Sequence, residues 1–167
     1  MNIQNTIKID NYTFKNYTIL NKEEKILALE FRNSNKEWMI NQNIIPLDEH
    51  LNWIETLNNN QKTIYFLVFK DNIPFMSIDY HDININKKEA YWGYFLGNQN
   101  YKSEVLKIEK LIIDIAFKQL KLNKLLCISD INNKVTKIHE FFGFKVDKKV
   151  TIENREFILM FLEKSDK

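Results

Sequence analysis

The chain has 167 residues, of which 44% are hydrophobic and 13% aromatic, and this suits one domain over residues 1–167 with a sizeable core. A formal net charge of +2 does not indicate nucleic acid or an anionic membrane as a partner, and no apolar run is long enough to span a bilayer. The first residues lack the basic and then apolar order of a signal peptide, so we expect a cytoplasmic protein. Cys127 is the single cysteine and the three histidines are scattered, so we expect neither a disulfide nor a metal site.

The first half of the chain combines strand and helix patterns. Residues 12–20 are rich in Tyr, Phe, Thr and Ile and predict a strand, whereas residues 22–32 place apolar side chains at helical spacing. A second helix is expected to begin near Pro46, because proline is tolerated in a first helical turn. An antiparallel meander of three strands follows, over residues 63–69, 73–79 and 89–96.

The second half predicts a strand–helix alternation that ends in a hairpin. The strongest helix pattern covers residues 103–120, where Leu106, Leu111 and Ile112 share one side with other apolar residues. A short buried strand, a helix and two final strands are expected after it, over residues 124–129, 133–142, 144–152 and 155–162. Gly143 suits the left-handed position that ends a helix.

This order of elements predicts an α/β fold with a central mixed sheet and helices on both of its faces. Strands joined through a helix are expected to run parallel, because such crossovers are right-handed. The strand that begins at Arg155 is expected to be exposed, and such a strand can pair across a homodimer.

Several segments carry a family resemblance. Residues 29–33 (LEFRN), followed by Trp38-Met39, and residues 49–54 (EHLNWI) resemble the opening of bacterial nucleotide-sugar N-acetyltransferases. Residues 131–134 (INNK) and 141–144 (FFGF) resemble the segments that flank the last catalytic helix of such enzymes. Together with the order of elements, they make the chain resemble the GNAT superfamily, and within it the N-acetyltransferases of pseudaminic acid biosynthesis, which modify flagellin sugars.

The resemblance implies a reaction and its two substrates. The acetyl donor would be acetyl-CoA, and the acceptor would be the 4-amino group of a UDP-linked 4-amino-4,6-dideoxy sugar. Two alternatives remain open at this point: a GNAT enzyme with another amine acceptor, and a GNAT-shaped binding module that has lost acetyl-CoA binding.

The pyrophosphate-binding region departs from the superfamily pattern. GNAT enzymes have a glycine-rich motif before the long helix, and its glycines let backbone N–H groups approach the phosphates. Here residues 98–104 read NQNYKSE, without glycine. We expect Lys102 and Ser103 to hold phosphate oxygens instead, provided that Glu104 points away from them.

Two residues are candidates for the acid–base chemistry of acetyl transfer. The family commonly places a tyrosine acid on the helix before the final hairpin, and counting back from Gly143 puts His139 at that position. A histidine gains or loses a proton near neutral pH, so His139 can protonate the leaving thiolate. Asp79 lies at a strand end and can take a proton from the amine, directly or through water. The competing interpretations are a surface helix residue for His139 and an ordinary turn carboxylate for Asp79.

Other residues are candidates for binding the two substrates. Near Phe95 and Cys127 we expect two neighbouring strands to separate and admit the thioester arm. The backbone of Phe95 and Leu96 would pair with the pantetheine amides in a strand-like way. The family resemblance implies that Asn132 hydrogen-bonds the same arm, and its other interpretation, a cap of the next helix, is compatible with that role. The nucleotide sugar would meet Arg32, Trp38, Met39 and His50.

Overall fold

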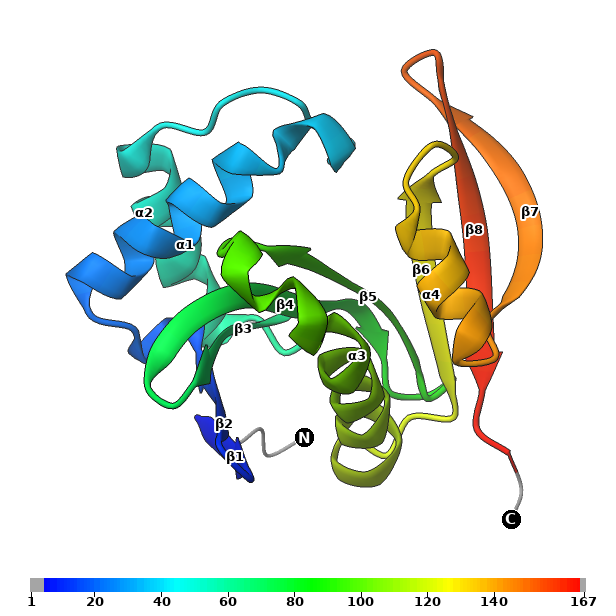
Figure 1. Cartoon of the computed structure of the whole chain (residues 1–167), viewed down its shortest axis with the longest axis horizontal. Helices are drawn as coiled ribbons and strands as arrows, with labels where there is room; N and C mark the ends of the chain where they lie inside the picture. Colours follow the sequence, from blue (N-terminus) through cyan, green and yellow to red (C-terminus); the bar gives the residue numbers. More distant parts are fainter. Residues whose placement is uncertain (1–4, 166–167) are drawn as a thin grey trace.

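A computed structural model describes residues 5–165 as one mixed sheet with helices on both of its faces (Figure 1). The strand order is β1-β2-β3-β4-β5-β6-β8-β7. The strands are β1 (Thr6–Ile9), β2 (Tyr12–Asn16), β3 (Ile64–Lys70), β4 (Ile73–Asn84), β5 (Glu89–Leu96), β6 (Lys124–Asp130), β7 (Lys145–Ile152) and β8 (Arg155–Glu163). The α-helices are α1 (Lys22–Ser34), α2 (Leu47–Thr56), α3 (Val105–Asp114) and α4 (Val135–Phe141). The predicted fold class is confirmed.

The N-terminal segment differs from its prediction at both ends. The short strand β1 was not predicted, and β2 ends at Asn16 although the pattern favoured a strand up to residue 20. The Asn16 side chain accepts a hydrogen bond from the Thr18 amide and starts a 3-10 turn there. Helix α1 then begins with a capping box between Asn21 and Glu24, which satisfies two backbone amides that otherwise lack partners.

The predicted long helix consists of three parts. A 3-10 segment, η4 (Gln99–Glu104), precedes α3, and a π-helical segment, η5 (Ile115–Gln119), follows it. Leu106, which we expected on the buried side, is 49% exposed, because the buried stripe runs through Val105, Ile108 and Ile112. Each residue advances about 100° around an α-helix, so Leu106 lies about 100° from Val105 and about 120° from Ile112, outside this stripe.

The C-terminal strands have an order that corrects one expectation. As predicted for a helical crossover, β5 and β6 are parallel. The strand after Arg155, β8, lies inside the sheet, where it pairs antiparallel with β6 on one side and β7 on the other. It therefore offers no free edge for a dimer. The free edge on this side of the sheet is β7.

The two faces of the sheet hold two separate cores. A main core lies between the sheet and α3, and residues from α4 pack against it. A second core lies under α1 and α2. Strand β3 shows the alternation, because Phe66 and Val68 belong to the main core and Leu67 to the second. Among residues 5–165, no helix combines the length and apolar character needed to cross a bilayer.

Candidate active site

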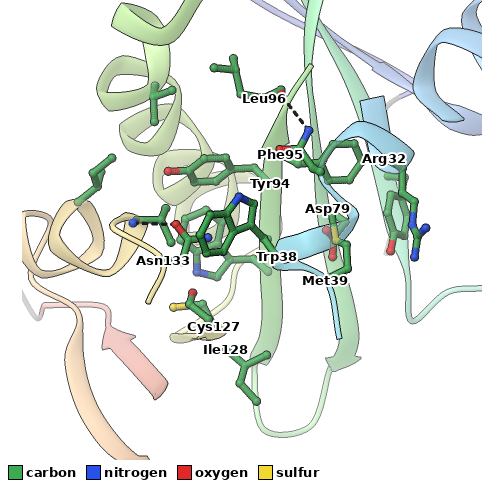
Figure 2. Close-up of a pocket in the computed structure, with 18 of the residues that line it drawn as sticks. Arg32, Trp38, Met39, Asp79, Tyr94, Phe95, Leu96, Cys127, Ile128 and Asn133 are labelled. Atoms are coloured by element: carbon green, nitrogen blue, oxygen red, sulfur yellow. Dashed lines mark hydrogen bonds between the residues drawn. The ribbon is translucent and has the colours of Figure 1, made fainter. Parts of the chain in front are cut away.

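Strands β5 and β6 separate halfway along their length, as the sequence predicted. They are paired only where Glu89, Ala90 and Tyr91 face Lys124, Leu125 and Leu126. Beyond this point β6 continues to pair with β8, so the neighbouring edge of β5 is left without a strand. A cavity of about 1040 Å³ opens between them, and Figure 2 shows Tyr94, Phe95 and Leu96 on one side of it and Cys127 and Ile128 on the other.

The cavity connects the two faces of the sheet. Trp92, Tyr94 and His139 line it on the side of the main core. Asp79 and Tyr65 line it on the side of α1 and α2. A molecule on one face can therefore reach a molecule on the other through the gap between the strands.

The glycine-free segment before α3 presents suitable groups to this cavity. Both Lys102 and Ser103 line it. Glu104 accepts hydrogen bonds from Lys70 Nζ, at 2.7 Å, and from the Tyr12 hydroxyl. The hydrogen bond from Lys70 is the main reason why the pKa of Glu104 lies below its ordinary value. The negative charge of Glu104 is thus held by Lys70 and does not belong to the lining of the cavity.

The other predicted cofactor residues also surround the cavity. Phe95, Leu96 and Asn132 line it, and the Leu96 carbonyl accepts a hydrogen bond from Asn35 Nδ2 at 2.9 Å (Figure 2). The capping alternative for Asn132 is wrong. The N-cap position of α4 is Lys134, and the side chain that meets the first turn is Asn133, whose Oδ1 accepts from the Val135 amide at 3.1 Å.

His139 is buried on α4 and belongs to a hydrogen-bonded group that crosses the main core. Its Nδ1 lies 2.7 Å from Oε1 of Glu109 on α3, and the other carboxylate oxygen, Oε2, accepts from the Tyr94 hydroxyl at 3.2 Å. The rings of Trp92 and Phe144 pack against the imidazole. His139 is therefore not a surface residue, which removes the competing interpretation of it.

Asp79 lies on the opposite face and has a histidine partner of its own. Its Oδ2 lies 2.5 Å from Nδ1 of His81, whose ring stacks on Tyr91. Burial raises the pKa of Asp79, although the hydrogen bond from His81 opposes the effect. Burial lowers the pKa of His81, but the hydrogen bond and charge of Asp79 outweigh it, so that this pKa is raised. The pair is thus a buried carboxylate joined to a half-buried imidazole, which can exchange protons with solvent.

The four predicted nucleotide-sugar residues all line the far part of the cavity. Trp38 is 40% exposed, whereas His50 is buried and its Nε2–H donates to the Lys25 carbonyl at 3.0 Å. Arg32 donates to the carbonyls of Asn41 and Asn43, so part of its guanidinium holds the loop before α2. The Met39 carbonyl accepts a hydrogen bond from Arg155, at the start of β8, at 2.7 Å.

Three residues with clear structural roles at the site were missed from the sequence. Arg155 joins Asp130 at the end of β6 to the carbonyls of Glu37 and Met39, and no sequence pattern links positions so far apart. Glu109 gave a usable signal, because it is a carboxylate within the apolar stripe of α3. Tyr94 gave none beyond its place in a strand.

Cys127 is buried, as expected for a packed thiol, and burial raises its pKa strongly. It is therefore a poor nucleophile. Among residues 5–165, no three side chains of metal-binding type come together.

Comparisons with known proteins agree with this fold and cleft. No family model matches the chain. The crystal structure of spermidine N-acetyltransferase SpeG from Vibrio cholerae, in complex with CoA and spermine, superposes with a TM-score of 0.80 over 93% of this chain and 96% of that one. Its sequence is only 14% identical, so the likeness shows a shared fold. This chain, with its two strands separated over a cavity, therefore has the fold of the GNAT acetyltransferases.

The acetyltransferase PseH is more similar to this chain in sequence than SpeG is. The acetyltransferase PseH of Campylobacter jejuni subsp. jejuni strain 81-176 is 29% identical over 154 residues, which cover 91% of this chain and 94% of PseH. The crystal structure of Campylobacter jejuni PseH in complex with acetyl coenzyme A has a TM-score of 0.75 at 27% identity, over 92% of this chain and 99% of that one. This chain is an acyltransferase of the GNAT fold that resembles PseH, and the family resemblance seen in the sequence is confirmed.

Proposed function

We propose that this chain transfers the acetyl group of acetyl-CoA to the 4-amino group of a UDP-linked 4-amino-4,6-dideoxy sugar, as a step of pseudaminic acid synthesis. The observation that carries the proposal is the cavity that passes between β5 and β6 and reaches both faces of the sheet. A thioester held on the side of α3 and an amine held on the side of α1 and α2 would meet inside it. The similarity to PseH supports this acetyl donor, because one PseH structure contains acetyl coenzyme A.

The residues on the α3 side fit acetyl-CoA, which supplies the thioester. The unpaired edge of β5 from Trp92 to Leu96 offers backbone groups of the kind that pair with an extended amide chain. Lys102 and Ser103 offer a positive charge and a hydroxyl to phosphate oxygens. Asn132 completes this part of the cavity from the segment before α4.

The acid–base roles are divided between the two faces. The amine nitrogen forms a bond to the thioester carbonyl carbon, the carbon–sulfur bond breaks, and its electron pair stays on sulfur. Asp79 takes the proton that the amine loses and holds it until the product leaves, while the Nδ1–H of His81, whose ring is partly open to solvent, keeps donating to Oδ2. His139 gives a proton to the sulfur, so that free CoA leaves as a thiol.

The acceptor side fits a nucleotide sugar. Trp38 offers a ring face for stacking on a base or a sugar, and the remaining donors of Arg32 suit a diphosphate. Glu49 also lines this side and would suit a positively charged amine instead, which keeps another amine acceptor as the second candidate.

The test combines a turnover assay with a binding measurement. We expect release of CoA thiol when the chain is mixed with acetyl-CoA and a UDP-linked 4-amino sugar, and we expect heat of binding on titration with UDP alone. Turnover with a polyamine and no heat with UDP would replace the nucleotide-sugar acceptor. Absence of turnover with every amine would remove the enzymatic proposal.

The cytoplasmic location, the single domain and the homodimer stay predictions.

A further inference from the structure

No step of the proposed reaction uses the carboxylate of Glu109, although this side chain is completely buried. Its side chain is 0% exposed in the middle of the apolar stripe of α3, between Val105 and Ile112. Removing a carboxylate from water is costly unless charged or polar partners compensate for it. The burial of this carboxylate therefore depends on its hydrogen-bond partners.

Both oxygens of Glu109 are engaged by residues of the active-site cavity. His139 Nδ1 lies 2.7 Å from Oε1, and the Tyr94 hydroxyl donates to Oε2 at 3.2 Å. The Tyr94 hydroxyl is a donor to Glu109, and a carboxylate at this position takes the Nδ1–H of His139 as its second donor. Among residues 5–165, no protein group hydrogen-bonds to Nε2 of His139, and the residue lines the cavity. Nε2 is thus the ring nitrogen that remains to meet a substrate.

We propose that Glu109 is a positioning residue for the proton donor: it fixes the His139 ring through Nδ1, so that Nε2 meets the cavity and its proton can be given to the leaving sulfur. This inference rests on the proposed function and deepens it. When the carbon–sulfur bond breaks, the sulfur takes the Nε2 proton, and His139 becomes neutral while Nδ1–H still donates to Glu109. The imidazole regains a proton before the next turnover.

The surroundings of His139 leave Glu109 as the partner with a charge. The titratable groups that contact the ring are Glu109 from α3 and Tyr94 from β5, and Cys127 from β6 lines the same cavity. Burial raises the pKa values of both Tyr94 and Cys127, so these two groups are neutral near pH 7. Among the described residues, Glu109 is therefore the group that can place a negative charge against the His139 ring.

The experiment compares Glu109→Gln, His139→Gln and the double variant with the unchanged chain. Glutamine keeps the size of the glutamate and a carbonyl acceptor for Nδ1–H, but it removes the negative charge. We expect kcat to fall about 100-fold in His139→Gln and about tenfold in Glu109→Gln, with KM for acetyl-CoA unchanged in both. We expect Glu109→Gln to move the alkaline limb of the kcat profile to lower pH, and to cause no further loss in the His139→Gln background. Glu140→Gln, an exposed neighbour on α4, is the matched control.

The outcomes separate this inference from the proposed function. If His139→Gln is slow while Glu109→Gln keeps the kcat and the pH profile of the unchanged chain, the inference alone is overturned. If His139→Gln is fully active, the proton donor lies elsewhere and both roles are overturned, and a complete loss in Tyr94→Phe would point to Tyr94. Nitrogen-15 NMR of the histidines gives a result even without turnover. We expect a hydrogen-bonded Nδ1–H signal that disappears in His139→Gln, and its absence from the unchanged chain would contradict the inference.

Discussion

Gly97 shows how the absence of one side chain positions the acceptor side of the site. It follows β5, and a Cβ atom at this position would lie 2.0 Å from Cγ of Phe31, far inside contact distance. Phe31 is buried on α1, and one turn later Asn35 donates to the Leu96 carbonyl. The close approach at Gly97 thus brings α1 against the end of β5, where the cavity opens.

Gly97→Ala should lower the free energy of unfolding by about 1–3 kcal/mol, because the buried Phe31 ring has to move to make room. Chemical denaturation monitored by tryptophan fluorescence measures this change. Gly93→Ala is the matched control, since its Cβ would meet Asp79 Oδ1 at 3.3 Å, a contact that a small shift relieves. Equal stability of the two variants would contradict the packing described at Gly97.

At the scale of elements, Arg155 joins two segments that form opposite walls of the cavity. From the start of β8 it donates to Asp130 Oδ2 at 2.7 Å, and it also donates to the carbonyls of Glu37 and Met39 in the segment after α1. The amide of Asn132 and the charge of Arg155 hold the pKa of Asp130 below its ordinary value. Asp130 is therefore committed to this link rather than to activating a water molecule.

Arg155→Lys should weaken acceptor binding and leave acetyl-CoA binding unchanged. Lysine keeps the charge, but its single ammonium group cannot reproduce the fork of donors that spans three acceptors. We expect KM for the acceptor to rise severalfold, and the free energy of unfolding to fall by about 1–3 kcal/mol. Steady-state kinetics with each substrate varied in turn checks this. Glu156→Gln, an exposed change on the same strand, is the control, and an equal rise of both KM values would argue against a role on the acceptor side.

On the scale of the whole molecule, the site depends on two features of the sheet. Each face of the sheet carries its own core, and β5 and β6 separate between them. The main core supports β5 from the side of α3, and the second core supports the same strand from the side of α1. Since β6 is held by β8, the separation of β5 and β6 does not leave either strand unsupported. The cavity is therefore bordered by two strands that are each held in place by the rest of the sheet.

Acetyl-CoA should stabilise the folded chain by mass action, because the cavity that would bind it exists in the folded state and not in the unfolded chain. At a concentration 100 times Kd the gain is about 2.7 kcal/mol, which a thermal melt detects as a higher Tm. In Lys102→Ala the same concentration should give a smaller shift, since a positive charge near the phosphates is lost. An unchanged Tm at saturating acetyl-CoA would show that the glycine-free segment does not bind the donor.

The sequence by itself determined most of the elements and the fold class. Hydrophobic periodicity and turn residues are local properties, so α1, α2, the meander and the left-handed Gly143 were predictable. The separation of β5 and β6 and the residues around it also followed from the family resemblance. The short β1, the early end of β2 and the division of the long helix were not predictable, because single hydrogen bonds and terminal turns decide them.

Only the tertiary structure decided which side chains share a hydrogen bond or an ion pair. The Glu109–His139 pair joins residues 30 positions apart, and Arg155 reaches carbonyls 116 and 118 positions away. The interior position of β8 likewise depends on which strand fills the place beside β6. Such pairings depend on how whole elements pack, so local residue patterns do not predict them.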